Sequence, residues 1–220
     1  MIPLVPSISR AAVKRNLLTF VNPQSRVSEQ YRAIRNQIKF FAGEQTVRSV
    51  VITSPGIGEG KTTTAVNLAV SMALRGDRVL LVDADLSKPR LHVTFNVPNV
   101  SGLSGMLTGK LTLHEAVSHT EIHGLDVLCS GPVHGREAEL IASNGVNILL
   151  HKARERYDLV MFDCPSVLTV TDTSIMANQC DGVILVINSG RTDKAAALEA
   201  KKVLERVKAN VIGVVMNKHR

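Results

Sequence analysis

The chain has 220 residues, of which 45% are hydrophobic, enough to bury a substantial core in one large domain. A formal charge of +7 leaves a polyanionic ligand open, but only 3% of the residues are aromatic, so stacking surfaces for single-stranded nucleic acid are scarce and nucleic acid is not an expected partner. Three widely spaced cysteines, without histidines at metal-ligand spacing, exclude a zinc site and a disulfide framework.

Residues 1–25 are predicted to form an N-terminal arm, because the first part of the chain holds two prolines and shows no clear hydrophobic period. This arm lacks the features of a secretory signal. No apolar run in the chain reaches the roughly 18 residues that a membrane-spanning helix requires. We therefore expect a soluble, cytoplasmic protein whose single domain covers residues 26–220.

A helix is predicted before the first strand, over residues 26–41. Its apolar positions follow three- and four-residue spacing: Val27, Tyr31, Ile34 and Ile38. Ser28 is the expected N-cap, which gives a helix of residues 28–41 within the domain.

The rest of the chain alternates short apolar runs with longer helical patterns. The predicted strands are Ser49–Thr53, Val79–Asp83, Leu125–Cys129, Asp158–Asp163, Gly182–Asn188 and Val211–Asn217. The predicted helices are Lys61–Arg75, Glu137–Arg156, Thr171–Asn178 and Lys194–Lys208. Because the strands are apolar throughout, both faces of their sheet should be covered. The order indicates a doubly wound α/β fold with a mainly parallel sheet of about six to eight strands flanked by helices, and residues 86–124 should form loops with short helices.

The stretch SPGIGEGKTTT, from Ser54 to Thr64, follows a strand and opens a helix, as a phosphate-binding loop does. Pro55 stands where the strict pattern has its first glycine, which alters the rim of the loop and not the part that contacts phosphate. Lys61 would meet the phosphates and the Thr62 hydroxyl would bind Mg²⁺. The predicted nucleotide-binding residues of this loop are Gly58, Glu59, Gly60, Lys61, Thr62 and Thr63.

Carboxylates follow two of the predicted strands. Asp83 and Asp85 come at the end of one strand and Asp163 closes another, so all three should face the crevice beyond the carboxyl ends of the sheet. They could hold Mg²⁺ and accept a proton. For Asp83 the alternative is a cap of the following turn, and the third acid favours the functional interpretation. The residues alone leave Mg·ATP and Mg·GTP open.

Four segments together resemble the bacterial tyrosine kinases of capsular and exopolysaccharide synthesis, P-loop proteins of the deviant-Walker group. They are GEGKTTTAVNLAVSMALRGDRVLLVDADLSKPRLH, GLSGMLTG, YDLVMFDCPSVLTVTD and NVIGVVMNK. The likeness runs from about Asn22 to Lys218. Upstream of the first strand, SEQYRAIRNQI matches the ExxRxxR helix of that family through Glu29, Arg32 and Arg35.

The resemblance implies an autophosphorylating protein-tyrosine kinase with ATP and Mg²⁺ as cofactors. It implies catalytic roles for Lys61, Asp83, Asp85 and Asp163, with Asp83 assisting deprotonation of the attacking tyrosine. Thr62, Asp85 and Asp163 would hold Mg²⁺, partly through water, and Asn217 would contact the base. On residue type alone, turn formation explains Asn217 equally well.

The resemblance also implies partners. The helix with Glu29, Arg32 and Arg35 would mediate a ring-like homo-oligomer, although a solvated charged face would show the same spacing. A separate transmembrane adaptor would recruit the chain to the inner face of the membrane and activate it towards protein tyrosines.

Three departures from the family pattern leave alternatives open. Ser87 replaces an arginine, Ser166 replaces the second proline of DxPP, and no tyrosine cluster precedes the final residues NKHR. The chain could lack its tail, phosphorylate other proteins, or be a nucleotide-binding regulator without catalysis. A partition-type or division-site ATPase switch is the other alternative, but Gly56 stands where those relatives keep a lysine.

Overall fold

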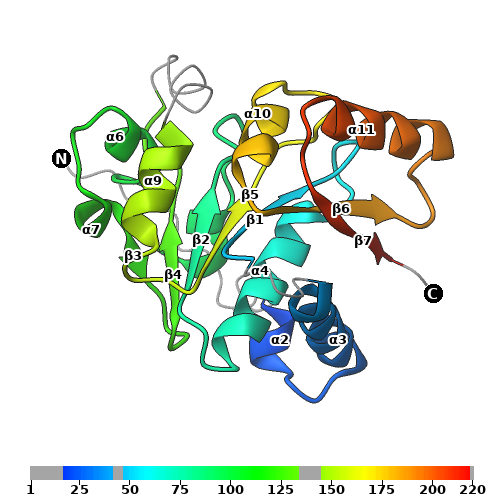
Figure 1. The fold of residues 1–220 in the computed structure, drawn as a ribbon. Helices are drawn as coiled ribbons and strands as arrows, with labels where there is room; N and C mark the ends of the chain where they lie inside the picture. The colour runs from blue at the N-terminus through cyan, green and yellow to red at the C-terminus, as the bar shows by residue number, and fades with distance from the viewer. Residues whose placement is uncertain (1–16, 42–46, 134–144, 219–220) are drawn as a thin grey trace.

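The computed structural model describes residues 17–41, 47–133 and 145–218. Within these ranges, seven strands form one sheet in the order β3-β4-β2-β5-β1-β6-β7 (Figure 1). Their bounds are β1 Ser49–Thr53, β2 Val79–Asp83, β3 Ser118–His119, β4 Leu125–Leu128, β5 Leu159–Asp163, β6 Gly182–Asn188 and β7 Val211–Asn217. Every neighbouring pair is parallel except the short edge strand β3, which pairs antiparallel with β4. The mainly parallel, doubly wound architecture is therefore confirmed.

Helices cover both faces of this sheet, as Figure 1 shows. On one face lie α2 Leu18–Val21, α3 Arg26–Phe41 and α4 Lys61–Ala73. The other face carries α9 Val146–Ala153, α10 Asp172–Gln179 and α11 Lys194–Arg206, with α6 Leu103–Leu107 and α7 Leu113–Ala116 beside them. The helix α5, Leu91–Phe95, follows β2. The predicted helix Glu137–Arg156 falls partly outside the described residues, which contain α9 in its second half.

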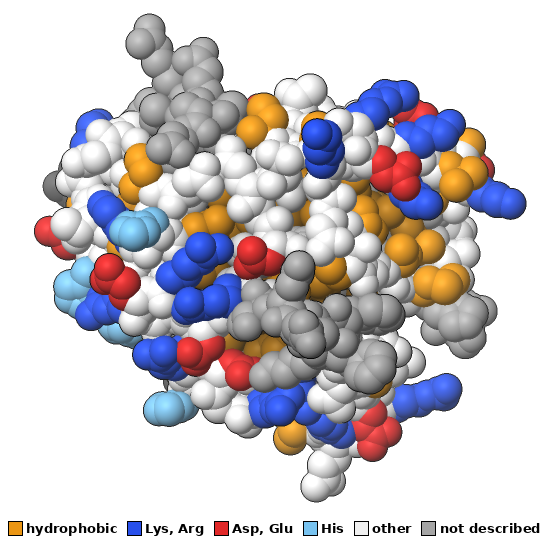
Figure 2. All heavy atoms as spheres, in the orientation of Figure 1, with side chains coloured by type: hydrophobic (Ala, Val, Ile, Leu, Met, Phe, Trp, Pro, Cys, Tyr) orange, Lys and Arg blue, Asp and Glu red, His pale blue; other side chains and the backbone are white. Residues whose placement is uncertain are grey.

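The basic excess of the sequence is not gathered into one patch on the face shown in Figure 2. Lys and Arg side chains form several separate groups there, with Asp and Glu among them. Hydrophobic side chains come to the surface on the side where Figure 1 places β6, β7 and α11. The exposed members in this region include Leu198, Val214 and Met216.

The helix α3 begins at Arg26, two residues before the predicted N-cap. The Ser28 N–H donates to the Ser25 hydroxyl oxygen at 3.2 Å, while the Ser28 hydroxyl donates to the Asn22 carbonyl at 2.6 Å. The prediction of Ser28 as N-cap is therefore wrong, because a turn over residues 22–25 places Ser25 directly before the first helical residue. One further short helix, α2, lies in the predicted arm.

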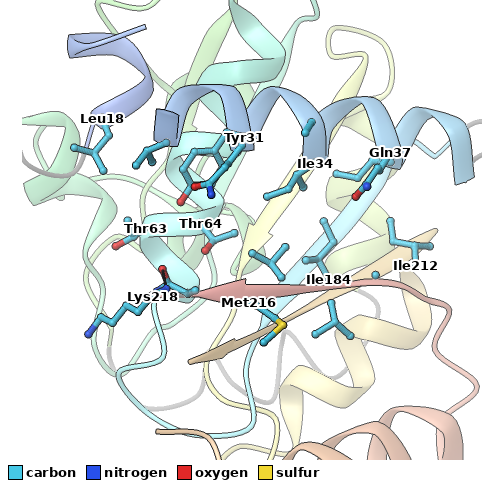
Figure 3. A pocket seen from close by; sticks show the side chains of 18 residues that line it. Leu18, Tyr31, Ile34, Gln37, Thr63, Thr64, Ile184, Ile212, Met216 and Lys218 are labelled. Atoms are coloured by element: carbon cyan, nitrogen blue, oxygen red, sulfur yellow. Dashed lines mark hydrogen bonds between the residues drawn. The ribbon is translucent and has the colours of Figure 1, made fainter. Parts of the chain in front are cut away.

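The apolar stripe of α3 faces the protein. Tyr31 and Ile38 are buried, and Figure 3 shows Tyr31 and Ile34 pointing from α3 towards α4 and the β7 side of the sheet. Val27 is 39% exposed but lines the same cavity as Tyr31, Ile34 and Ile38, so the predicted apolar face of the helix is present. Val27 stands in the first turn, at the rim of the contact.

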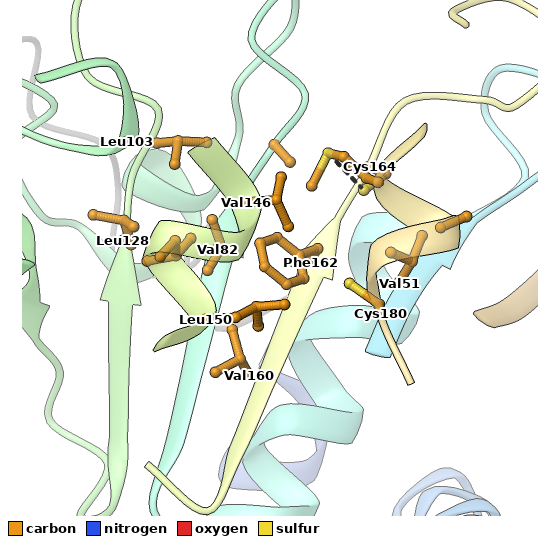
Figure 4. Packing of buried hydrophobic residues seen from close by; sticks show 14 of the residues in the cluster. Val51, Val82, Leu103, Leu128, Val146, Leu150, Val160, Phe162, Cys164 and Cys180 are labelled. Carbon is orange, nitrogen blue, oxygen red and sulfur yellow. Dashed lines mark hydrogen bonds between the residues drawn. The ribbon is translucent and has the colours of Figure 1, made fainter. Parts of the chain in front are cut away.

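The core consists of two clusters, one on each face of the sheet. Successive side chains of a strand point to opposite faces, so Val51 and Phe162 pack under α9 and α10, whereas Ile52 and Met161 pack against α4. Figure 4 shows Phe162 at the centre of the first cluster. Burial on both faces explains why these strands are apolar throughout.

Candidate active site

The loop Ser54–Gly60 joins the end of β1 to the start of α4. Its backbone is left-handed at Gly58, with φ of 81°, and at Gly60, with φ of 98°. A Cβ atom on Gly60 would collide with the side chain of Asn217. Glycine is therefore required at this position both by the backbone angle and by the close approach of β7. Together with the N-terminus of α4, such a loop presents backbone N–H groups that can surround a phosphate.

The rim around Pro55 is fastened to the segment that follows β5. The Val167 N–H donates to the Ser54 carbonyl at 2.9 Å, and the Thr53 hydroxyl donates to the Pro165 carbonyl at 2.7 Å. Ser166, one of the departures from the family pattern, is buried with its hydroxyl 3.4 Å from the Ser54 hydroxyl. The altered rim is thus held by its own set of contacts, and the left-handed glycines lie further along the loop.

Asp83 and Asp163 lie side by side at the carboxyl ends of β2 and β5, where they are register partners. Both side chains are almost fully buried. One oxygen of Asp83 accepts hydrogen bonds from the N–H groups of Arg90 at 2.8 Å and Leu91 at 2.9 Å, so Asp83 does cap the turn that enters α5. The other oxygen of Asp83 and Oδ1 of Asp163 are buried without a hydrogen-bond partner. Each carboxylate therefore keeps an oxygen that can serve a ligand.

Burial controls the protonation of this pair. It raises the pKa of Asp83 to about 6, opposed by backbone hydrogen bonds from Leu91, Arg90 and Asp85, and raises the pKa of Asp163 to about 7. The negative charge of Asp83 adds to the rise in the pKa of Asp163, while the Thr62 hydroxyl, which donates a hydrogen bond to Asp163, and the Lys61 ammonium lower it. Both carboxyl groups thus change charge close to neutral pH in the protein without a bound cation.

Lys61 and Asp85 form an ion pair across the mouth of the loop, with Nζ and Oδ2 separated by 3.6 Å. The other oxygen of Asp85 accepts hydrogen bonds from the Ser87 hydroxyl at 3.0 Å and the Lys88 N–H at 3.1 Å. Ser87, which stands where the family has an arginine, therefore orients Asp85. The Lys61 ammonium lies where it can exchange this carboxylate for a phosphate oxygen.

Asn217, at the end of β7, lies directly against the loop. Its Nδ2 donates to the Glu59 carbonyl at 2.9 Å, and its Oδ1 accepts from the Lys218 N–H at 3.0 Å. An amide side chain retains one donor and one acceptor site after two such bonds, so contact with a base stays possible. Glu59 itself is only 5% exposed, and its side chain turns into the protein. It therefore contributes to the loop through its backbone.

Sequence reasoning missed one residue of this site, Thr192. Its hydroxyl donates to Glu59 Oε1 at 2.8 Å, from the connection between β6 and α11. No motif marks this threonine, since the two residues are 133 positions apart. A cavity of about 750 Å³ also adjoins the site, bounded by α3 and β7 and ending at Thr63, Thr64 and Asn217 (Figure 3).

The donor set suits Mg²⁺ bound together with a polyphosphate. Within the described ranges, no three His, Cys, Asp or Glu side chains converge into a metal site of their own. Mg²⁺ typically binds one or two carboxylates, keeps several waters and takes the remaining oxygens from a substrate phosphate. The unpartnered Oδ1 of Asp163, beside Thr62, matches that requirement.

The three residues of α3 that match the ExxRxxR pattern differ in their contacts. Glu29 and Arg32 pair at 3.7 Å on the exposed side, and Arg32 also donates to the Pro23 carbonyl at 2.6 Å. Arg35 turns towards α4, where its Nη1 donates to the Ser71 carbonyl at 2.8 Å. The three residues therefore do not form a single free surface. A role in self-association stays a prediction for them.

Comparisons with known proteins agree with this geometry. The AAA domain family matches residues 47–211. Tyrosine-protein kinase YwqD of Bacillus subtilis is 44% identical, over 93% of this chain and 86% of its own. The chimerical protein CapA2B2 superposes with a TM-score of 0.89 at 39% identity, covering 93% of this chain and 90% of the other. The kinase domain of Escherichia coli ETK superposes with a TM-score of 0.87 at 30% identity, covering 93% and 82%.

Two further observations concern membrane-spanning helices and the identity of the nucleotide. Among the described helices, none combines the length and apolar character needed to cross a bilayer. The phosphate loop belongs to a P-loop domain of kinase type, which implies ATP as the nucleotide. Because the match to a named kinase extends over most of both chains, this chain belongs to the bacterial tyrosine-protein kinases of capsule and exopolysaccharide synthesis.

Proposed function

We propose that this chain transfers the γ-phosphoryl group of Mg·ATP to tyrosine hydroxyls of proteins that take part in polysaccharide synthesis and export. The observation that carries the proposal is the assembly of Lys61, Asp85 and the buried pair Asp83 and Asp163 around one phosphate loop. Such a site positions phosphates and stabilises charge, which is the main task in phosphoryl transfer.

Each residue has a proposed role. The backbone N–H groups of residues 58–62 and the Lys61 ammonium bind the phosphates. Thr62, Asp85 and Asp163 hold Mg²⁺, partly through water. Mg·ATP supplies the transferable phosphoryl group and the neutralising cation. Asn217 contacts the base with the donor and acceptor that its bonds to the loop leave free.

Asp83 is the proposed general base. It accepts the proton of the attacking tyrosine while the tyrosine oxygen forms its bond to phosphorus and the bond from phosphorus to the departing ADP breaks. A pKa of about 6, raised by burial, leaves Asp83 mostly ionised at neutral pH and a stronger base than an exposed aspartate. Its bonds to the N–H groups of Arg90 and Leu91 fix the carboxylate in place.

Neither Tyr31 nor Tyr157 is proposed as a phosphoacceptor. The chain has two tyrosines, Tyr31 and Tyr157, and each is 8% exposed. Tyr31 packs between α3 and α4, and the Tyr157 hydroxyl donates to Asp126 at 2.8 Å. Both therefore serve packing.

Two partners are proposed in addition. A membrane adaptor would recruit the chain to the inner face of the membrane, which the name of the CapA2B2 chimera supports by joining a CapA part to a CapB part. Self-association through Glu29 and Arg32 would bring active sites and substrates together. The exposed position of their ion pair supports this role.

A kinase assay tests the function. The protein is mixed with Mg·ATP, the cytoplasmic tail of its adaptor and a tyrosine-containing copolymer, and phosphotyrosine is measured. We expect phosphotyrosine with the parent protein and with Lys202→Met, a change on the exposed side of α11, and none with Lys61→Met. Nucleotide-dependent assembly without phosphotyrosine would instead identify an ATPase switch or a scaffold.

A further inference from the structure

The connection between β6 and α11 lies against the phosphate loop. Thr192 is its central contact: the hydroxyl oxygen accepts from the Asn188 N–H at 2.7 Å, and the hydroxyl donates to Glu59 Oε1 at 2.8 Å. Glu59 is 5% exposed, and its second carboxylate oxygen is buried without a hydrogen-bond partner. Thr192 therefore provides the side-chain hydrogen bond that the structure gives to this buried carboxylate.

One more hydrogen bond holds the same part of the loop, and an arginine side chain lies beside it. Asn217 donates to the Glu59 carbonyl at 2.9 Å, so both the backbone and the side chain of Glu59 are bonded to segments that follow neighbouring strands. The Arg191 guanidinium lies at Gly58, with Nη1 3.4 Å from the position that a Cβ there would occupy. The loop is thus braced at Glu59 by Thr192, which follows β6, and by Asn217, the last residue of β7.

This bracing matters because the loop has to hold a conformation that most chains avoid. Gly58 and Gly60, on either side of Glu59, both have positive φ angles. Glycine reaches these angles easily but also leaves them easily, since it has the most conformational freedom of any residue. Glu59 lies between the two glycines, and both its carbonyl and its carboxylate accept hydrogen bonds. These bonds limit the conformational freedom of the loop before a ligand binds.

We propose that Thr192 is a positioning residue for the nucleotide site, acting through Glu59 to preorganise the phosphate loop. The inference rests on the proposed function only in taking the loop as the site that binds ATP phosphates. Thr192 touches neither the phosphates nor the reacting atoms. Its effect should appear in ATP affinity and in the mobility of the loop amides.

The test compares Thr192→Val, which removes the hydroxyl at nearly constant volume, with Thr192→Ser, which keeps it. Thr108→Val is the control, since the Thr108 hydroxyl also makes local hydrogen bonds, to the carbonyls of Ser104 at 2.9 Å and Gly105 at 3.1 Å, at the end of the distant helix α6. Two quantities are measured: the Kd for Mg·ATP with a fluorescent nucleotide, and hydrogen exchange of the amides of residues 56–60 in nucleotide-free protein.

We expect Thr192→Val to raise the Kd by about ten-fold and to speed exchange in the loop, as the loss of a hydrogen bond to a charged group predicts. Thr192→Ser should restore both. In a double-mutant cycle, Thr192→Val should have a smaller effect when Glu59 is already alanine, because both changes remove the hydrogen bond between Thr192 and Glu59.

Unchanged Kd and exchange in Thr192→Val would overturn the proposal, as would equal effects of Thr192→Val and Thr108→Val. If the parent protein binds no ATP, the proposed function fails, but faster loop exchange in Thr192→Val alone would still support the bracing role. If that variant also left exchange of the loop amides unchanged, the bracing role would fail together with the proposed function.

Discussion

Asp83 and Asp163 are register partners on adjacent strands, and both are buried at the carboxyl edge of the sheet. Two like charges in this position repel each other, and each has lost most of its hydration. The fold tolerates them because each retains hydrogen-bond donors: two backbone N–H groups for Asp83 and the Thr62 hydroxyl for Asp163. The pair therefore opposes folding when both groups are ionised and no cation is bound.

The first prediction concerns the pH dependence of stability in nucleotide-free, Mg²⁺-free protein. The folded-state pKa values, about 6 for Asp83 and about 7 for Asp163, lie above the ordinary value of 3.8. Groups with raised pKa values stabilise the fold fully below the unfolded pKa and lose this contribution as the pH rises through the folded pKa. One pKa unit corresponds to about 1.4 kcal/mol, so we expect the free energy of unfolding to fall by an amount on the order of 5 kcal/mol between about pH 4 and about pH 8.

Urea unfolding across that range measures the effect, and Asp163→Asn serves as the control. Burial lowers the pKa of His92, which acts in the opposite direction, so the difference between parent and variant isolates the carboxylate. The variant should show a flatter profile. Parallel profiles for the two proteins would contradict the prediction.

A second prediction separates the general base from the binding residues. Asp83→Asn keeps an oxygen that can accept from the N–H groups of Arg90 and Leu91 but cannot take the tyrosine proton. We expect kcat to fall by roughly 10² to 10⁴, while the Kd for Mg·ATP stays within a few-fold. Steady-state kinetics and nucleotide titration measure the two constants. If the affinity for Mg·ATP fell by the same factor as kcat, Asp83 would be reassigned to nucleotide binding.

The sequence was sufficient for those parts of the molecule that depend on local pattern. The apolar strands with covered faces, the phosphate loop before α4 and the acids at strand ends all follow from residue type and neighbours. The parallel arrangement then places Asp83 and Asp163 at the same edge of the sheet, because the carboxyl ends of parallel strands share one edge. Their direct adjacency follows from the strand order, in which β2 lies next to β5, and the sequence did not predict that order.

Features that depend on distant contacts could not be predicted in this way. Ser28 has the right residue type for an N-cap, but the preceding turn gives that position to Ser25. Thr192 has an ordinary loop environment in the sequence and gains its role from Glu59, which is far away along the chain. The strand β3 has only two residues, too few for any periodicity.

A third prediction addresses the contact between the loop and β7. Gly60→Ala places a Cβ against the Asn217 side chain and also strains a backbone with φ of 98°. Gly76→Ala is the matched control, because Gly76 has a φ of 102° but no atom within 4 Å of its Cβ position. Both changes should lower the free energy of unfolding by roughly 1 to 3 kcal/mol, but only Gly60→Ala should abolish ATP binding.

Adding Asn217→Ala to Gly60→Ala checks the cause. The second change removes the collision and leaves the backbone strain, so part of the lost stability should return. Calorimetry and nucleotide titration provide the two measurements. If Gly76→Ala weakened ATP binding as much as Gly60→Ala, a general effect on α4 would explain both variants.

The last prediction divides the charged residues of α3 between folding and assembly. Arg35 donates to the Ser71 carbonyl of α4 in a partly buried contact, whereas Arg32 pairs with Glu29 where the two side chains are 39% and 67% exposed. Arg32 also donates to the Pro23 carbonyl, but that contact is exposed, so water can replace it. A partly buried hydrogen bond from a charged group contributes about 1.5 to 3 kcal/mol, whereas exposed ion pairs contribute about 0 to 1 kcal/mol. Arg35→Ala should therefore lower the free energy of unfolding clearly, and Arg32→Ala should barely change it.

If the exposed side of α3 contacts a second copy, Arg32→Ala should shift sedimentation towards the monomer at unchanged stability. Arg32→Lys restores the charge and should recover part of the assembly. A stable Arg35→Ala variant, or an Arg32→Ala variant that assembles like the parent protein, would reject this division of roles.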